Sequence, residues 1–433
     1  MDYSRALKWL YERIGEGIKL GLGNTRKFLE ILGNPHHNYK NILIGGTNGK
    51  GSVCSYIAHI VSLCGAKVGL FTSPHLVTVR ERMAIIEKGR KRLIPPPVFA
   101  HLMGKLKEIV ESIPEFRPTY FETLTTASLL YFSWEKVDLA VLEVGMGGRL
   151  DATNVVDPIL SVITNVSFDH TQYLGDSIPK IAREKAGIIR KGTPIITGCE
   201  GEAVKVIRES AKEKNAPLYI LGEDFEVKKF EKRDGEISIH MKGLKGSYSL
   251  TTILWGDYQV HNLPLAVASC ELLMEFFPLT PQDIVEGVRI TRWPGRMEVL
   301  RRRPTIILDG AHNPGGALYL KREILRWKEE GKKITLIFGV LKDKERDKIM
   351  RELFPVVDEV RVTAPQSSRA VSPQTLFEEG KRYNPNVKLF PSVPEALLNL
   401  PKKNIILVSG SLYLVGEVRG KMLKLKGDGY EGV

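Results

Sequence analysis

A glycine-rich segment with a single lysine has the composition of a phosphate-binding loop. It runs from Gly45 to Ser52 (GGTNGKGS) and lies between a short apolar run and a stretch with helical spacing. Backbone N–H groups of such a loop, together with the N-terminus of the following helix, can face a phosphate. We therefore expect Lys50 to meet the outer phosphates and the hydroxyl of Ser52 to lie near Mg²⁺.

This segment departs from the common P-loop pattern. Ile44 stands where that pattern has its first glycine, and Gly51 stands where Ser or Thr directly follows the lysine. A glycine-rich turn that binds no ligand is therefore the alternative interpretation. The position between a predicted strand and a predicted helix favours phosphate binding.

A carboxylate interrupts the apolar run Leu139–Gly145. Glu143 lies near the C-terminal end of this predicted strand, where ligands bind in open α/β sheets. Burial of a carboxylate is costly unless a cation or a hydrogen-bond donor compensates. Metal ligation is the favoured interpretation, and a salt bridge to a core arginine is the alternative. Asp169 and His170 follow the next predicted strand, so we expect them at the same edge.

Other candidate residues carry weaker signals. Ser73 follows the strand after the glycine-rich loop and can supply another hydroxyl to the metal. Lys185 lies in a charged segment, where residue chemistry alone favours a solvated helix face. Asp309 and His312 end the first strand of a second α/β series. They can face the first domain across a cleft, and clefts between domains are favoured ligand sites.

Strands that alternate with helices predict a parallel sheet covered on both faces. Between residues 225 and 254 the pattern changes to a small β element, in which Asp234-Gly235 indicates a hairpin turn. The break at Trp293–Gly295 precedes the second series, so we expect a domain boundary near residues 294–296. The predicted strands are Asn41–Gly46, Lys67–Phe71, Asp138–Val144, Ile159–Thr164, Thr193–Thr197, Glu236–Met241, Ser247–Ile253, Thr305–Leu308, Lys333–Phe338, Glu359–Val362, Val387–Phe390 and Asn404–Val408. The predicted helices are Val53–Cys64, Val260–Phe276, Pro281–Ile290, Gly315–Glu330 and Gln374–Tyr383.

The overall composition is that of a soluble globular protein. The chain has 433 residues, enough for two or three domains, with 43% hydrophobic and 26% charged residues. Its N-terminus does not resemble a signal peptide, and no apolar stretch is long enough to span a bilayer. The four cysteines are far apart and indicate neither a zinc site nor a disulfide framework. We therefore expect a cytoplasmic protein.

The net charge of +13 has three interpretations. A solvated lysine-rich surface is the first, an anionic small molecule such as a nucleotide is the second, and nucleic acid is the third. The sequence lacks the interleaved aromatic and basic residues of an RNA-binding surface. We favour the first two interpretations.

Taken together and in this order, the motifs resemble those of the folylpolyglutamate synthases and bifunctional dihydrofolate synthases of the Mur ligase superfamily. The resemblance extends over nearly the whole chain and is most specific in GTNGKGS and LEVGMGGRLDATN. The segments that carry it are Leu22–Pro35, Gly46–Ser52, Thr72–Leu76, Tyr120–Thr123, Leu142–Asn154, Asp169–Thr171, Arg183–Ile188, Trp293–Glu298, Asp309–Pro314 and Ser409–Gly416.

This resemblance implies an α/β fold with two domains. Residues 1–294 would form an N-terminal P-loop ATPase domain with a mainly parallel sheet, a small β element and the folate site. Residues 295–433 would form a C-terminal Rossmann-like α/β domain that acts as the glutamate ligase domain. We expect a monomer that takes small-molecule substrates and binds neither nucleic acid nor membranes.

The same resemblance implies roles position by position. The residues implied in ATP binding are Thr47, Asn48, Gly49, Lys50, Gly51, Ser52, Asn262, Arg296 and Asp309. The residues implied in two Mg²⁺ sites are Ser52, Ser73, Glu143, His170 and Lys185, the last as the carbamylated lysine that the family uses as a carboxylate-like ligand. The residues implied in catalysis are Lys50, Lys185, Asp309 and His312. The residues implied near the pterin end of the substrate are Phe121, Thr123, Asp151 and Ala152.

Three positions differ from the family pattern. Tyr258 stands where the family often has His, and Leu263 stands where it has Ala. Glu345 stands where Asp is common. The catalytic positions are intact, so these differences bear on the detail of the nucleotide pocket.

The implied reaction is the ATP-dependent joining of L-glutamate to a folate carboxylate through an acyl phosphate, with release of ADP and phosphate. Because Arg149–Asn154 resembles the bifunctional bacterial enzymes, we expect dihydropteroate as a second acceptor. Another Mur-type amino-acid ligase is one alternative, but only about 40 residues precede the loop, fewer than an extra sugar-nucleotide domain requires. A non-catalytic protein that binds nucleotides or nucleic acid is the other, and it predicts salt-sensitive nucleic-acid binding.

Overall fold

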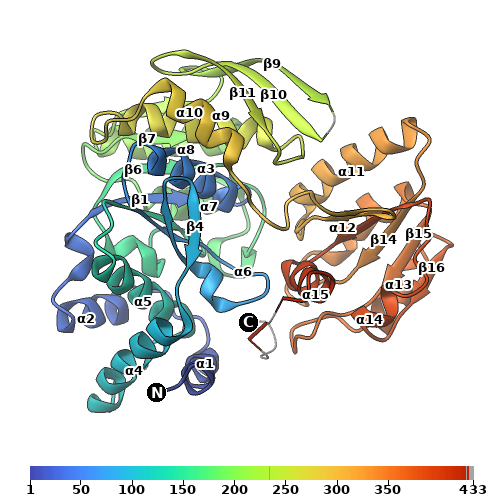
Figure 1. Cartoon of the computed structure of the whole chain (residues 1–433), viewed down its shortest axis with the longest axis horizontal. Coiled ribbons are helices and arrows are strands. Elements are labelled where there is room, and N and C mark those ends of the chain that lie inside the picture. The colour runs from blue at the N-terminus through green and yellow to red at the C-terminus, as the bar shows by residue number, and fades with distance from the viewer. Residues whose placement is uncertain (234, 426, 429–433) are drawn as a thin grey trace.

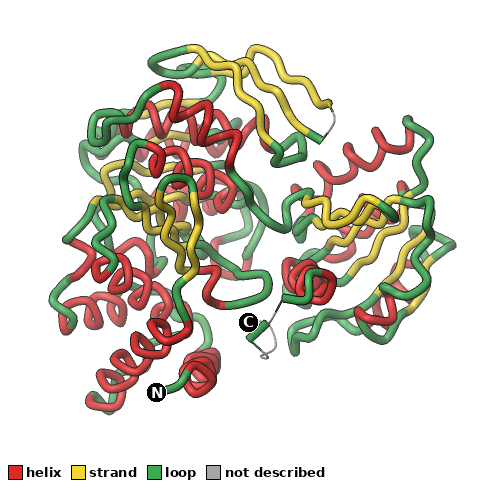
Figure 2. Tube along the Cα trace, in the orientation of Figure 1, coloured by secondary structure: helices red, strands yellow, loops and turns green. Residues whose placement is uncertain are grey.

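The computed structural model describes residues 1–233, 235–425 and 427–428. Figure 1 shows two lobes, an N-terminal lobe coloured blue to yellow and a C-terminal lobe coloured orange to red. In the described residues each lobe has its own mainly parallel sheet, and a small antiparallel sheet projects from the N-terminal lobe (Figure 2). The predicted α/β class with an additional small β element is therefore confirmed.

The N-terminal lobe is built on a mixed sheet. In the described part of the chain this sheet has eight strands in the order β4-β3-β2-β5-β1-β6-β7-β8. The six strands from β2 to β8 in this order pair in parallel, whereas β3 and β4 extend one edge as an antiparallel hairpin. Our strand predictions missed β3, β4 and β8. The bounds are β1 Lys40–Gly45, β2 Val68–Phe71, β3 Met83–Glu87, β4 Arg90–Leu93, β5 Leu139–Glu143, β6 Pro158–Ile163, β7 Ile195–Thr197 and β8 Leu218–Ile220.

Helices cover both faces of this sheet because its central strands are apolar on both sides. In β1, Leu43 packs into one core cluster, while Ile42 and Ile44 pack into the other. Helix α3 lies between the sheet and helices α9 and α10, so every residue from Gly51 to Ser62 is buried. The bounds are α1 Tyr3–Glu12, α2 Gly23–Ile31, α3 Lys50–Leu63, α4 Pro96–Ser112, α5 Tyr120–Trp134, α6 Thr171–Leu174, α7 Ile178–Ala186, α8 Gly201–Glu213, α9 Gln259–Leu273 and α10 Pro281–Ile290.

The small sheet consists of three antiparallel strands in the order β11-β10-β9. They are β9 Glu226–Arg233, β10 Glu236–Lys242 and β11 Ser247–Thr252. The prediction found β10 and β11 and missed β9, whose sequence EVKKFEKR has no apolar face. Gly235 has φ +87° at the predicted hairpin turn, and Asp234 lies outside the described residues.

The C-terminal lobe has a second α/β sheet, as predicted. Its strand order in the described residues is β12-β13-β17-β14-β15-β16, and β12 alone is antiparallel to its neighbour. The predicted strands of this lobe are confirmed within one residue, and β12 was missed. The bounds are β12 Glu298–Arg302, β13 Thr305–Leu308, β14 Ile334–Phe338, β15 Glu359–Val362, β16 Val387–Leu389, β17 Ile405–Ser409, α11 Pro314–Glu329, α12 Arg346–Leu353, α13 Pro373–Gly380, α14 Val393–Ala396 and α15 Leu412–Met422.

Within the residues that the structure describes, we find no helix with both the length and the apolar character needed to cross a membrane.

Candidate functional site

The candidate residues of the N-terminal lobe gather at the carboxyl ends of three neighbouring strands. β1 pairs with β5 on one side and β6 on the other, with Ile44 opposite Glu143 and Gly45 opposite Ile163. The glycine-rich loop follows β1, Glu143 ends β5, and the segment that leads to His170 follows β6. The sheet therefore brings the predicted phosphate loop and both candidate metal ligands to one edge.

The glycines of the loop are required by close approaches of other segments. Gly49 has φ +84°, and a Cβ there would lie 2.1 Å from Oδ1 of Asn262. A Cβ on Gly51 would lie 2.6 Å from the ring of Trp293. The loop is thus held from outside by two side chains, so no larger residue fits at these positions.

The loop backbone is also tied to the segment after β6. The N–H of Thr47 donates to the carbonyl of Asn165 at 2.9 Å, and the N–H of Asn48 donates to Oδ1 of Asn165 at 3.0 Å. Helix α3 begins at Lys50, so its first-turn N–H groups have no partner within the helix. The amides open to a phosphate therefore begin after Asn48. The side chains of Thr47 and Asn48 are themselves engaged, Thr47 with the backbone of Ser167 and Asn48 with Asn313.

Two lysine side chains converge on the same carbonyl of the loop. Nζ of Lys50 donates to the carbonyls of Gly46 and Thr47 at 3.2 and 3.1 Å, and Nζ of Lys185 donates to the carbonyl of Gly46 at 2.8 Å. Only 4% of the Lys185 surface is exposed, so the solvated helix face suggested by its residue chemistry is wrong. Burial, reinforced by the charge of Lys50, lowers the pKa of Lys185 to about 7.

Glu143 is buried next to the segment that contains Ser73. Its exposed fraction is 4%, and its Oε2 accepts the N–H of Ser73 at 2.9 Å. Burial raises the pKa of this carboxyl, while the charge of Lys50 opposes that effect. Among the described residues Glu143 forms no ion pair, so the salt bridge to a core arginine is not observed.

His170 and Asp169 lie at the start of helix α6. His170 has φ +48°, and its Nε2 lies 3.8 Å from Oδ2 of Asp169. Burial lowers the pKa of His170 to about 4, which keeps the imidazole neutral, the form that binds metals. Lys344 of the C-terminal lobe reaches Oδ1 of Asp169 at 3.0 Å and, despite the burial of that carboxyl, holds its pKa below the usual range.

In the C-terminal lobe, Asp309 and His312 follow β13. The carboxylate of Asp309 accepts the N–H of Ala311 at 2.9 Å, the N–H of Met297 at 3.0 Å and the hydroxyl of Tyr258 at 3.1 Å. Nδ1 of His312 lies 2.7 Å from the carbonyl of Gly310. That contact requires the proton on Nδ1, so Nε2 is left as an acceptor.

A direct contact joins the two halves of the candidate site. Nδ2 of Asn313 donates to Oδ1 of Asn48 at 2.9 Å, and Oδ1 of Asn313 accepts the N–H of Gly316 at the start of α11. Arg296 lies beside this strand end, because a Cβ on Gly310 would lie 2.1 Å from its guanidinium. The two predicted groups of site residues therefore meet across the lobe interface, as the sequence suggested for Asp309 and His312.

The four residues predicted near the pterin lie on two neighbouring segments, helix α5 and the start of the short helix Ala152–Val155. Phe121 packs on Phe71 with ring centroids 5.8 Å apart, and a Cβ on Gly145 would meet its ring. Asp151 accepts the N–H of Met146 at 2.8 Å, so both residues support the loop after β5. Ala152 is buried beside Asp151. Thr123 donates its hydroxyl to the carbonyl of Thr119 at 2.8 Å inside α5, which gives it a structural role in this helix.

Sequence reasoning missed Arg82. Its exposed fraction is 4%, its Nε donates to Nδ1 of His75 at 2.9 Å, and its guanidinium lies 5.2 Å from the ring centroid of Tyr120. A buried cation in contact with neutral partners is suited to an anionic ligand. The only signal in the sequence was its position a few residues after the motif that contains Ser73 and His75.

The donor set fits Mg²⁺ better than zinc. No cluster of three or more His, Cys, Asp and Glu side chains suited to a metal occurs in the described ranges. Mg²⁺ commonly keeps several waters and takes one or two carboxylates together with phosphate oxygens. The buried carboxylate of Glu143 beside the phosphate loop meets that requirement without a full protein cage.

Comparisons with known proteins agree with this geometry. Residues 44–270 match the Mur ligase middle domain, and residues 295–412 match the Mur ligase glutamate ligase domain. A dihydrofolate synthase/folylpolyglutamate synthase of Bacillus subtilis (strain 168) is 31% identical over 97% of this chain and 99% of its own length. Mycobacterium tuberculosis folylpolyglutamate synthase complexed with ADP aligns with a TM-score of 0.88 at 29% identity and covers 100% of both chains. An FPGS–AMPPCP–folate complex aligns with a TM-score of 0.84 at 31% identity over 98% of this chain and 100% of that chain.

Proposed function

Because the chain belongs to the folylpolyglutamate synthase and dihydrofolate synthase group of the Mur ligase family, we propose that it joins L-glutamate to folates with ATP, and that it also accepts dihydropteroate. The observation that carries this proposal is the convergence of Lys50, Lys185 and Glu143 on a glycine-rich loop that the C-terminal lobe touches through Asn313. The +13 net charge then serves anionic substrates.

The two lobes have different functions, and the boundary between them lies at residue 294. Residues 1–294 bind ATP and the folate, and residues 295–433 act as the glutamate ligase domain. The ranges of the two matched family domains support this division, since the first ends at residue 270 and the second begins at residue 295. The eight-stranded sheet belongs to a P-loop ATPase domain, and the six-stranded sheet belongs to a Rossmann-like domain.

The first chemical step joins two anions. A carboxylate oxygen of the folate attacks the γ-phosphorus of ATP, the bond from that phosphorus to the β,γ-bridging oxygen breaks, and ADP leaves. Lys50 and the first-turn amides of α3 offset the charge that builds up on the phosphate oxygens. Mg²⁺, when bound by Ser52, Ser73, Glu143 and His170, supplies further charge neutralisation at those oxygens.

The second step forms the amide. The glutamate amine attacks the acyl carbon, a C–N bond forms, the C–O bond to phosphate breaks, and phosphate and one proton leave. His312 offers Nε2 as the acceptor of that proton, since its Nδ1 is engaged by Gly310. The contact between Asn48 and Asn313 closes the lobes over the acyl phosphate, which keeps out the water that would hydrolyse it.

ATP is held from both lobes. Asn262 packs against Gly49 of the loop, and Arg296 and Asp309 lie at the facing strand end of the C-terminal lobe. Thr47 and Asn48 shape the loop around the phosphates through their contacts with Ser167 and Asn313, and Gly51 and Ser52 add amides of the first turn of α3. The pterin end of the substrate lies by Phe121 and Asp151, with Ala152 and Thr123 behind them.

Lys185 carries a carbamate in the active enzyme. A neutral amine is required, because its lone pair attacks CO₂ to give the carbamate and release a proton, and burial beside Gly46 favours the neutral form. Protein incubated with carbon-13 bicarbonate should show a carbamate carbon resonance that Lys185→Ala lacks. A spectrum without that resonance, from protein that is fully active after CO₂ has been removed, would contradict the modification.

The enzyme works as a cytoplasmic monomer. ATP and folates are cytoplasmic substrates, and each chain carries both halves of the site. The mass measured by native mass spectrometry should equal that of one chain, and a dimer mass at working concentration would contradict this.

The decisive experiment is an ADP-release assay with Mg-ATP and L-glutamate, run in parallel with dihydropteroate and with tetrahydrofolate. Release with both acceptors supports the bifunctional enzyme. Release with tetrahydrofolate alone restricts the activity to polyglutamate synthesis. No release with either acceptor across a temperature range directs attention to other Mur-type substrates. Salt-sensitive nucleic-acid binding without glutamate-dependent ATP use would support the non-catalytic alternative.

A further inference from the structure

Two polar contacts of helix α11 with the N-terminal lobe lie well apart, and the ring of Tyr319 packs against Tyr258 and His261 between them. The first is at the N-terminus of α11, where Asn313 caps the helix and donates to Asn48 of the phosphate loop. The second lies at Glu323, ten positions further along the same helix. At 1.5 Å per residue these two places are about 15 Å apart. Two contacts at that separation fix both the position and the tilt of α11.

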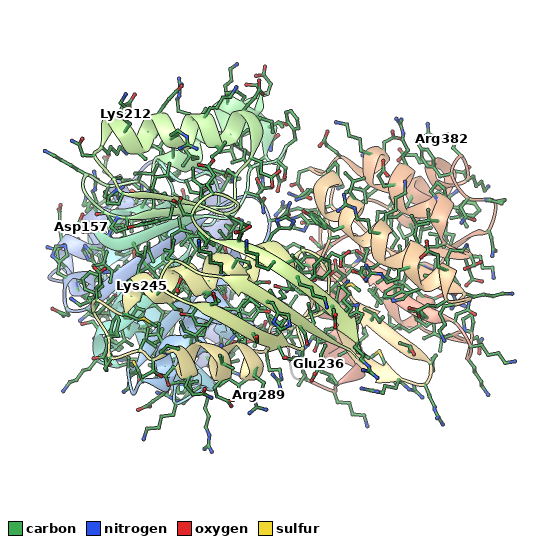
Figure 3. All side chains as sticks on the ribbon, turned by 90° about the horizontal axis from the view of Figure 1, so that it is seen from above. Asp157, Lys212, Glu236, Lys245, Arg289 and Arg382 are labelled. Atoms are coloured by element: carbon green, nitrogen blue, oxygen red, sulfur yellow. The ribbon has the colours of Figure 1, made fainter. Side chains whose placement is uncertain are left out.

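The second contact is made by the small three-stranded sheet. Nζ of Lys232 in β9 pairs with Oε1 of Glu323 and lies 2.6 Å from Oδ1 of Asp257. Arg326 lies 3.5 Å from Asp257 and 3.6 Å from Glu323. Figures 1 and 3 show the three strands extending from the N-terminal lobe to the C-terminal lobe, with Glu236 at the end next to that lobe.

This four-residue cluster is balanced in charge and buried at its centre, whereas Arg326 at its edge is 39% exposed. The side chains of Lys232 and Glu323 are 7% and 2% exposed. Two cations, Lys232 and Arg326, face two anions, Asp257 and Glu323, so the cluster is neutral as a whole. Removal of one member leaves an uncompensated buried charge, which strongly disfavours the arrangement that buries it. Separation of the lobes breaks the two ion pairs that cross the interface, which join Lys232 to Glu323 and Arg326 to Asp257.

The cluster is adjacent in sequence to a residue on the nucleotide side of the site. Asp257 directly precedes Tyr258, whose hydroxyl donates to Asp309. Trp255 and Tyr258 pack against the apolar core of the C-terminal lobe, although they precede helix α9 of the N-terminal lobe. The segment from Trp255 to Tyr258 is thus a part of the N-terminal lobe that packs directly on the C-terminal lobe.

We propose that Lys232 is a positioning residue for the ligase reaction, because its ion pairs hold α11, and with it His312 and Asn313, against the phosphate loop. The small three-stranded sheet then holds the two lobes at a fixed relative position. This inference rests on the proposed function for its kinetic part, whereas its geometric part can be tested without any substrate.

The test compares three variants of the full-length protein. Lys232→Met removes the charge and keeps the length of the side chain. Lys232→Met combined with Glu323→Gln removes one cation and one anion, so the remaining pair stays balanced and the fold is protected. Lys229→Met is the matched control, because Lys229 lies on the same strand but is 65% exposed and pairs with Glu231 within that strand.

Two readouts are needed. The first is the distance between spin labels on Lys212→Cys and Arg382→Cys, measured without ligands in a background with Cys64→Ser; both label positions are at the surface of their lobes (Figure 3). The second is kcat and KM for ATP in the ADP-release assay. Thermal unfolding of each variant reports on folding separately.

In the wild type and in Lys229→Met we expect a narrow distance distribution and equal kcat. In Lys232→Met and in the double variant we expect a broad distribution and a fall in kcat of about tenfold or more. KM for ATP should also rise, because Arg296 and Asp309 of the C-terminal lobe help to hold the nucleotide. A double variant that keeps the narrow distribution and wild-type kcat overturns the proposal. A wild type that is inactive with every folate acceptor counts against the proposed function, and the distance readout still decides the role of Lys232.

Discussion

In the N-terminal lobe, Lys50 and Lys185 direct their amines at neutral carbonyls of the phosphate loop, whereas in the C-terminal lobe the carboxylate of Asp309 receives three hydrogen-bond donors. Glu143, on the N-terminal side, has the N–H of Ser73 and forms no ion pair within the described part of the chain. One side of the site therefore holds charges without counter-charges, and the other holds a charge that is already satisfied.

This difference between the lobes indicates that the N-terminal side of the site binds the ligand and that Asp309 on the C-terminal side positions it. A buried charge without a counter-charge is costly in the empty protein, and the cost is relieved when a ligand of opposite charge arrives. Glu143 is such a charge, and Lys50 beside it is half-buried. A metal–nucleotide complex supplies both with a ligand of opposite charge. A ligand stabilises the carboxylate of Asp309 little, because three hydrogen-bond donors already contact it. Asp309 therefore contributes by holding a fixed orientation.

The largest effect is expected for Lys50→Ala. It removes the charge nearest the outer phosphates, and ADP release should fall by about a thousandfold or more. The fold should persist, because Lys50 contacts only loop carbonyls through its amine. Activity is measured by ADP release and folding by thermal unfolding. Lys191→Ala, an exposed lysine of the same lobe, is the control and should retain full activity. Normal turnover of Lys50→Ala would remove the basis for the assigned site.

A somewhat smaller effect is expected for Glu143→Gln. The amide keeps an oxygen for the N–H of Ser73 but removes the negative charge, so kcat should fall by about a hundredfold and the Mg²⁺ concentration for half-maximal activity should rise. Because burial raises the pKa of Glu143, loss of this charge should leave thermal stability unchanged or increase it. An unchanged Mg²⁺ dependence, seen in a titration of ADP release, would argue that Glu143 acts elsewhere.

The smallest effect is expected for Tyr258→Phe. It removes one of three donors to Asp309, which corresponds to about 1 kcal/mol, or roughly a fivefold rise in KM for ATP. Tyr258→His, which restores the residue that the family often has, should recover part of this loss. Tyr319→Phe is the control, since the Tyr319 ring packs edge-on against Tyr258 at 6.4 Å. If Tyr258→Phe and Tyr319→Phe behave alike, the hydroxyl of Tyr258 does not orient Asp309.

The sequence was informative about the fold at most strands that are buried on both faces. Strands such as β1 and β5 are continuous apolar runs, and they were found within one residue. Among the strands that were missed, β4, β9 and β12 are short or exposed and rich in Arg, Lys and Glu, β8 has only three residues, and β3 is buried. Backbone hydrogen bonds to the neighbouring strands hold these strands in the sheet. The periodicity of side chains in the sequence carries no information about such bonds.

The site was predictable to the extent that motifs follow strand ends. Lys50, Glu143 and His170 share an edge because β5 and β6 flank β1, which alternating strands and helices suggest. Burial of Lys185 could not be read from a charged segment, because it depends on how α7 packs against the loop. Lys344 and Lys232 form ion pairs with residues more than 90 positions away in the sequence. A local sequence pattern cannot predict such contacts.

The contacts that Asn262 and Trp293 make with Gly49 and Gly51 have a consequence for synthesis of the protein on the ribosome. Both residues emerge roughly 200 positions after the loop they hold, and helices α9 and α10, which bury α3, emerge with them. A nascent chain that ends before residue 262 contains every residue from Gly45 to Ser52 but lacks the side chain that packs on Gly49. We therefore expect nucleotide binding to begin only when the N-terminal lobe is nearly complete.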